Sequence, residues 1–160
     1  MIREIKTYPN KILKQKAKRV GQIDAEIKKL IDDMAETLYA KGGAGLAANQ
    51  VGELKQIIVV DIGEGLKILV NPKIIDKKDK AIMIEGCLSL PGYEILVKRP
   101  EKIVVEYLDR QGREQKLKAS DLLARVICHE VDHLQGKTLL DKLPIFKRWT
   151  IKRKLKKIIK

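Results

Sequence analysis

The chain has 160 residues, a length typical of one domain with a sizeable hydrophobic core, and a formal net charge of +13. Its first residues carry mixed charge, and no stretch approaches the ~20 consecutive apolar residues of a membrane-spanning helix. We therefore expect no secretory leader and no membrane insertion, and a cytoplasmic protein. The sequence contains no internal repeat, low-complexity tract or long linker.

The first predicted element is a helix over residues 24–41, in which apolar residues recur at helical spacing. It is followed by the segment GAGLAANQ at 43–50. The small residues leave the backbone open to close approach by another chain or a ligand, and Gln50 offers an amide donor. Taken alone, this segment is better explained by a helix end followed by close packing than by a binding site.

Short apolar runs predict strands, and turn residues between them set their limits. The Asn71-Pro72 pair is expected to end the strand before it, because Pro restricts the conformation of the preceding residue. The sequence DRQG at 109–112 predicts a hairpin turn. The predicted strands are 56–61, 66–70, 82–84, 95–97, 103–108 and 113–117.

Cys87 lies in the segment EGCLSLP at 85–91 and is a candidate metal ligand, because a thiolate binds iron or zinc strongly. Gly86 beside it allows close backbone approach. A buried, inert cysteine is the commoner alternative for such a residue. The other cysteine, Cys128, is interpreted as a packed thiol, and a disulfide between the two is not expected in a cytoplasmic chain.

The most informative stretch is HEVDH at 129–133, within a predicted helix over 120–136. Residues four apart lie on the same helix face, so His129 and His133 can reach one metal ion. Glu130 can then reach water on that ion without being a ligand. We expect one stripe of this helix to face the interior, namely Leu122, Val126, His129 and His133.

Two core histidines beside a surface Glu would produce the same pattern. A catalytic metal site usually has three protein ligands and one open position. The extended zinc-protease pattern would place a third His where this chain has Leu139, so the third ligand must come from upstream, and Cys87 is the best candidate. Asp132 is interpreted either as support for the site or as part of a salt bridge, with Arg99 or Arg125 as its partner.

Positive charge is concentrated at the carboxyl end, where residues 147–160 contribute eight Lys and Arg and no acid. Apolar residues recur there at helical spacing, which predicts a basic amphipathic helix belonging to the same domain as residues 1–146. This helix either docks on the body with a solvated Lys face or binds RNA phosphates. An anionic membrane surface is a weaker alternative.

Together, three segments resemble the motifs of the peptide deformylase family. GAGLAANQ, EGCLS and HEVDHLQG match that family's GxGLAAxQ, EGCLS and HExDHLxG patterns in order and at similar spacing. The resemblance runs from the amino terminus to about residue 143. Cys128 departs from it, because the family often has Gln there, and we expect this to alter packing or the pocket wall. The resemblance implies an α+β fold, with mixed or antiparallel β-sheets around a central metal-binding helix and with a C-terminal helix.

The same resemblance implies a metal-dependent hydrolase. It would remove the formyl group from the N-terminal formylmethionine of newly made polypeptides and release formate. Cys87, His129 and His133 would hold one divalent metal ion. Ferrous iron is the expected metal in the cell, and nickel, cobalt or zinc can occupy the same site, because Cys and His suit several of these metals.

Further roles follow from matching the motifs residue by residue. Glu130 would act first as general base and then as general acid. The side-chain amide of Gln50 and the backbone N–H of Leu88 would stabilise the oxyanion, and Gly45 would leave room beside the formyl group. The substrate-binding residues implied are Gly43, Ala44, Gly45, Gly86 and Leu88.

Rival functions remain open at this point. Another metal-dependent amidase or peptidase on the same scaffold would keep the ligands and prefer a different acyl group. A non-catalytic RNA-binding protein with a structural metal lacks support, because the chain has only one Phe, one Trp and four Tyr. A cysteine hydrolase with Cys87 as nucleophile explains the paired histidines less well than a metal site does. The expected partners are formylmethionyl nascent peptides and, through the basic helix, the ribosome, but not DNA.

Overall fold

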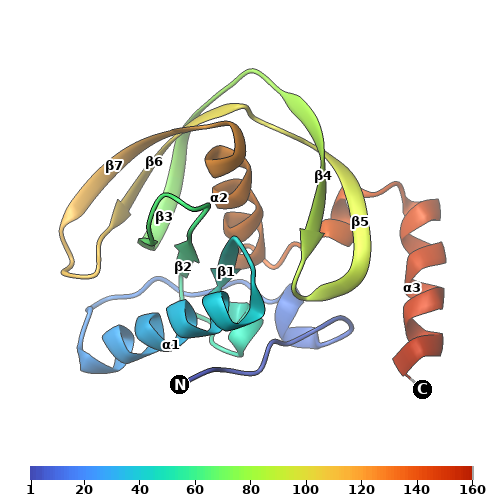
Figure 1. Ribbon diagram of the computed structural model, residues 1–160, viewed down its shortest axis with the longest axis horizontal. Helices are drawn as coiled ribbons and strands as arrows, with labels where there is room; N and C mark the ends of the chain where they lie inside the picture. The colour runs from blue at the N-terminus through green and yellow to red at the C-terminus, as the bar shows by residue number, and fades with distance from the viewer. Residues whose placement is uncertain (160) are drawn as a thin grey trace.

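The computed structural model describes residues 1–159 as two antiparallel β-structures and three α-helices. A five-stranded sheet has the order β1-β2-β3-β6-β7, and a separate ribbon pairs β4 with β5 (Figure 1). All pairings between these strands are antiparallel, so the predicted α+β class is confirmed in its antiparallel form. The strands are β1 (Gly45–Ala47), β2 (Ile57–Val60), β3 (Lys67–Lys78), β4 (Ala81–Cys87), β5 (Leu90–Arg99), β6 (Lys102–Leu108) and β7 (Glu114–Ser120).

Strand β2 is buried on both faces, because a helix covers each side of it. Successive side chains of a strand point to opposite faces. Ile57 and Val59 pack with α1 (Ala25–Lys41), whereas Ile58 and Val60 pack in the cluster that includes α2 (Asp121–Leu134). The metal-binding helix predicted from the sequence therefore lies against the sheet, on the face opposite α1 (Figure 1).

Helix α1 begins and ends as the sequence predicts. The Asp24 side chain caps its amino end by accepting a hydrogen bond from the backbone N–H of Ile27, at 2.9 Å. Gly42 ends the helix in the left-handed conformation, with φ of 68°. The predicted helix over 120–136 is also confirmed as α2, which begins directly after Ser120; the side chain of Ser120 makes no capping hydrogen bond.

The strand prediction was wrong at Asn71-Pro72, where β3 continues instead of ending. A shift of register between Val70 and Lys73 accommodates the Pro, as a β-bulge does. Asn71 has a φ of 50°, and its side chain bonds both the N–H and the C=O of Val20. These long-range bonds hold a backbone conformation that the local sequence does not favour.

Strands β4, β5, β6 and β7 extend beyond their predicted limits, whereas β2 is shorter than predicted. Strand β1 was not predicted, because three residues are too few to give an alternating strand pattern. The hairpin turn at 109–112 is confirmed: the N–H of Gly112 bonds the C=O of Asp109, and β6 pairs with β7 around it. Short 3-10 helices complete the described fold, at η1 (Lys11–Lys14), η2 (Ala48–Val51) and η3 (Leu139–Lys142).

Helix α3 (Ile145–Ile159) lies beside the β4–β5 ribbon at the edge of the molecule (Figure 1). It starts before the predicted limit, and Lys160 lies outside the described residues. Leu155 is buried and Ile151 half-buried against residues of β5 and η3. The guanidinium of Arg148 donates to the carbonyl oxygens of Leu140 and Leu143. Within the described residues, no helix is long and apolar enough to cross a membrane.

Candidate active site

The structure brings the three predicted metal ligands together from two different elements. Cys87 comes from the end of β4, and His129 and His133 come from successive turns of α2. The Sγ of Cys87 lies 3.3 Å from the Nε2 of His133, which lies 3.3 Å from the Nε2 of His129. The three ligand atoms all lie within 4.8 Å of one another. This donor set fits a metal ion, because a thiolate and two imidazoles are common ligands of iron and zinc.

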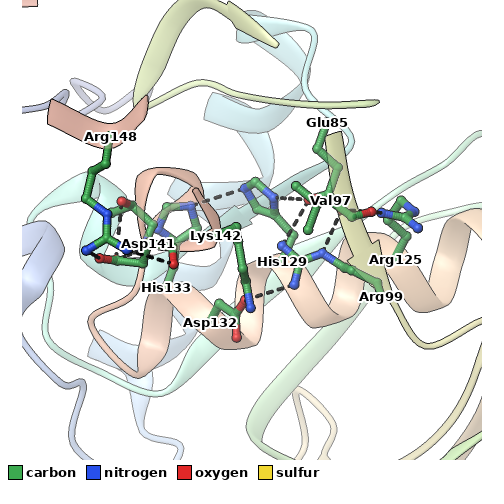
Figure 2. A network of polar contacts seen from close by, with 11 residues as sticks. Glu85, Val97, Arg99, Arg125, His129, Asp132, His133, Asp141, Lys142 and Arg148 are labelled. Atoms are coloured by element: carbon green, nitrogen blue, oxygen red, sulfur yellow. Dashed lines mark hydrogen bonds and ion pairs between the residues drawn. The ribbon is translucent and has the colours of Figure 1, made fainter. Parts of the chain in front are cut away.

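A buried carboxylate orients the first of these imidazoles. Glu85 accepts a hydrogen bond from the Nδ1 of His129 at 2.9 Å (Figure 2). The Nε2 of His129 lies 3.3 Å from the Nε2 of His133 and within 4.8 Å of the Sγ of Cys87. Metal-ligating histidines characteristically have such a partner on their other nitrogen. With its proton on Nδ1 and bonded to Glu85, the imidazole of His129 has its Nε2 free to bind a metal ion.

Glu85 also pairs with two buried arginines. Its Oε2 accepts from the Nε of Arg99 and from the Nη1 of Arg125, each at 2.6 Å (Figure 2). Burial raises the pKa of Glu85, but the hydrogen bonds from His129 and Arg99 outweigh it and lower the pKa to about 2. Glu85 is thus a buried anion that holds the β4–β5 ribbon to α2.

The partner of Asp132, which the sequence left open, is Arg99. The Nη1 of Arg99 donates to the Oδ2 of Asp132 at 2.8 Å, and the ammonium of Lys142 approaches the same oxygen at 3.0 Å. Arg125 instead bonds Glu85 and the backbone of β4 and β5. Asp132 therefore extends the network around Glu85 rather than contacting the ligand cluster.

Glu130 follows His129 on α2 and lines the same cavity as Cys87 and His129 of the ligand cluster. Its side chain is buried, and its Oε2 has no hydrogen-bond partner among the described residues. Burial raises the pKa of Glu130 to about 7. A Cβ at Gly45 would lie 2.7 Å from the Oε1 of Glu130 and 2.7 Å from Val126, so only Gly fits there. The carboxylate is therefore held close to the backbone of β1.

The side-chain amide of Gln50 points its NH2 group towards Cys87 of the ligand cluster. Its Oε1 accepts from the backbone N–H of Ala47 at 2.8 Å, which fixes the orientation of the amide. The Nε2 then donates to the Oγ of Ser89 at 3.1 Å and lies 3.6 Å from the Sγ of Cys87. Next to Gln50, the side-chain amide of Asn49 donates to the carbonyl of His133 and ties η2 to α2.

These groups lie along a cavity of about 680 Å³, a size typical of small-ligand and peptide-end sites. Its walls come from the 42–45 and 83–94 segments and from α2. All of the predicted substrate-binding residues line it, namely Gly43, Ala44, Gly45, Gly86 and Leu88.

The family profile described as polypeptide deformylase matches residues 2–149. The chain belongs to the polypeptide deformylase family. A peptide deformylase of Thermoanaerobacter pseudethanolicus is 47% identical over 141 residues, which cover 88% of this chain and 89% of the relative. One of Thermodesulfovibrio yellowstonii is 46% identical over 160 residues, covering 97% of each chain.

Solved deformylase structures have the same fold. That of Ehrlichia chaffeensis in complex with actinonin superposes with a TM-score of 0.94 at 43% identity, covering 98% of this chain and 96% of that one. The deformylase of Thermotoga maritima gives a TM-score of 0.88 at 34% identity, covering 90% of this chain and 99% of that one. The resemblance drawn from the three motifs and the fold it implied are thus confirmed.

One prediction about α2 of this deformylase was wrong. Leu122 does not face the interior: it is 47% exposed, and together with the half-buried Val126 it lines the cavity. The core face of the helix is instead formed by Leu123, Ala124 and Ile127. The stripe that carries the two histidines therefore has two parts. In the first turns of α2 its residues, Leu122 and Val126, line the cavity, and in the last turns His129 and His133 form part of the ligand cluster.

Cys128 is buried in the core cluster of α2 and the sheet, as the packed-thiol interpretation predicts. Burial raises the pKa of its thiol. Both cysteines are free.

Sequence reasoning missed the outer wall of the deformylase cavity, which includes Met83, Ile84, Tyr93 and Glu94. Only their place on the β4–β5 ribbon brings these residues to the site. It also missed that Glu85 orients the imidazole of His129. The position of Glu85, two residues before the candidate ligand Cys87, could have indicated a role near the metal site.

Proposed function

We infer that the chain is a peptide deformylase, a metal-dependent hydrolase that removes the formyl group from N-terminal formylmethionine and releases formate. Its family, its relatives and its fold support this activity. The observation that carries it is the convergence of Cys87, His129 and His133 beside the carboxylate of Glu130. The buried Oε2 of this carboxylate has no hydrogen-bond partner in the part of the chain that the structure describes. A hydrolase needs this combination of an electrophilic centre and a proton carrier at one end of a cavity.

Cys87, His129 and His133 are the proposed ligands of the metal. A divalent metal ion held there supplies a Lewis acid that polarises a carbonyl oxygen and lowers the pKa of water. Ferrous iron is the proposed metal in the cell, and nickel, cobalt and zinc suit the same thiolate and imidazole donors. Ferrous iron would make activity sensitive to oxygen, since the thiol of Cys87 is oxidisable.

Glu130 is the proposed proton carrier. Its carboxylate accepts a proton as water attacks the formyl carbon, and it delivers that proton to the amide nitrogen as the C–N bond breaks. The amide Nε2 of Gln50 and the backbone N–H of Leu88 are the proposed donors to the oxyanion. Gly45 keeps the space beside Glu130 free for the formyl hydrogen. The products are formate and a peptide with a free amino-terminal Met.

Formate release from formyl-Met-Ala-Ser by protein loaded with ferrous iron or nickel tests this proposal. We expect release that a chelator abolishes and that added metal restores. Metal-loaded protein that releases no formate would overturn the activity.

We further propose that the enzyme works in the cytoplasm and binds the ribosome through the basic surface of α3. Bound there, it would encounter its substrates, the nascent chains. Residues 147–160 carry eight positive charges and no acid. Leu155 packs inward, whereas Lys154, Lys156 and Lys157 are exposed. This arrangement presents a basic face to solvent, and RNA phosphates bind such a face with strong salt dependence.

Changing Lys154, Lys156 and Lys157 together to Gln should weaken co-sedimentation with ribosomes and reduce its salt dependence. The buried contact of Leu155 is kept, so activity on short peptides should be preserved. The matched control changes three exposed lysines at the end of β3 and in the β3–β4 connection, Lys77, Lys78 and Lys80, to Gln. Equal co-sedimentation of both variants would refute a specific role for α3.

A further inference from the structure

Glu, Arg and His side chains line the cavity at five positions, and four of these five side chains are buried in the site already described. Glu85, Arg125 and His129 belong to one hydrogen-bonded network, and Glu130 is buried beside the ligand cluster. Glu94 is different: it is exposed, and no hydrogen bond or ion pair engages it among residues 1–159. Of these five side chains, Glu94 is therefore the one whose charge is exposed to the part of a substrate that lies outside the ligand cluster.

The cavity wall beside Glu94 is also open. Glu94 precedes Ile95, which pairs with Glu85 at the end of the regular β4–β5 ladder. A Cβ at Gly86 would meet nothing closer than a backbone oxygen 3.9 Å away, and a Cβ at Gly92 would meet nothing within 4 Å. A substrate side chain can therefore approach the carboxylate without displacing a neighbouring group.

We propose that Glu94 is a specificity-determining residue that favours Lys or Arg over Asp or Glu among the residues after formylmethionine. This proposal rests on the deformylase activity proposed above. The substrate must extend out of the site, because only its formyl end can reach Glu130 and the ligand cluster. The residues after Met then pass along the outer wall to which Glu94 belongs.

The overall charge of the protein predicts the opposite preference. A net charge of +13 attracts acidic peptides through the long-range field of the whole molecule. If the enzyme nevertheless prefers peptides with a basic residue, the preference must come from a local contact such as that with Glu94, and not from the overall charge. A solvent-exposed ion pair has a modest effect, so we expect kcat/KM for the Lys peptide to exceed that for the Glu peptide by roughly threefold.

The test uses metal-loaded full-length protein and amidated peptides of the form formyl-Met-Ala-Ala-Ser. Lys or Glu replaces the second, third or fourth residue in turn, and kcat/KM is measured from formate release. The Lys/Glu ratio should exceed one at one of these positions, fall towards one in Glu94→Gln, and invert in Glu94→Lys. It should also fall at about 0.5 M salt, where the screening length is only about 4 Å.

Glu114→Gln is the matched control, because Glu114 is an exposed carboxylate on β7 outside this cavity. The Lys/Glu ratio should be the same in this variant as in the wild type. A wild-type ratio at or below one at all three positions would overturn the proposal, as would a ratio that Glu94→Gln leaves unchanged. In either case formate release from the uncharged parent peptide would show that the deformylase activity itself stands; its absence would instead refute that activity.

Discussion

The Glu130→Gln variant is expected to lose roughly 10³-fold in kcat for formate release, because general acid–base groups contribute about 10²–10⁴-fold. Gln has nearly the same shape as Glu but cannot accept or deliver the proton. Glu130 is not among the three converging ligand atoms, so the variant should bind metal as the wild type does. Initial rates of formate release and the metal content per chain, measured on the same preparations, check both expectations.

Folding should not suffer from this substitution. The Oε2 of Glu130 is buried without a hydrogen-bond partner among the described residues, and burial disfavours its charged form. A neutral amide at this position should therefore leave Tm equal or slightly higher. A variant that retains more than about a tenth of wild-type kcat would contradict the role of Glu130 as proton carrier. Loss of metal from the variant would contradict its assignment as a non-ligand.

The Glu85→Gln variant is expected to lose both stability and metal affinity. The substitution leaves the buried guanidinium of Arg125 without a carboxylate partner and that of Arg99 with Asp132 alone. Removing one partner of a buried ion pair typically costs about 3–5 kcal/mol. For a chain of this size, that corresponds to a fall in Tm on the order of 10 °C.

Metal affinity should fall because Glu85 orients the imidazole of His129. Loss of such a supporting partner typically weakens metal binding by about 10–100-fold. The matched control is Glu106→Gln, which breaks an exposed ion pair with Lys116 whose N–O distance is 3.7 Å. It should change stability by less than about 1 kcal/mol. Thermal unfolding gives the Tm of both variants, and metal titration gives their metal affinities. Equal losses of Tm and of metal affinity in the two variants would refute the structural role of the Glu85 network.

The helices and the ligand set could be predicted from sequence because each depends on local spacing. The apolar period of α1, its Asp24 cap and Gly42 fix that helix locally. His129 and His133 are separated by about one helical turn, and this spacing alone places both side chains on the same face of α2. That Cys87 joins them could be inferred only from the family resemblance and from the need for a third ligand.

What could not be predicted depends on contacts between distant segments. The left-handed backbone of Asn71 is held by two hydrogen bonds to Val20, so the continuation of β3 is invisible in the local sequence. The choice of Arg99 rather than Arg125 as the partner of Asp132 depends on how the β4–β5 ribbon lies across α2. Leu122 was misassigned because an apolar residue lining a substrate cavity has the same helical spacing as one in the core.

The rates of hydrolysis of formyl-Met-Ala-Ser and acetyl-Met-Ala-Ser by the same metal-loaded protein test the central claim most directly. A Cβ at Gly45 would lie 2.7 Å from the Oε1 of Glu130, so the backbone of β1 and this carboxylate lie close together. We therefore expect a formyl group to fit beside them and the additional methyl group of an acetyl group to be excluded. The account predicts rapid release of formate and little or no release of acetate. Comparable rates on the two peptides would contradict it and would indicate a general metal-dependent amidase on the same scaffold.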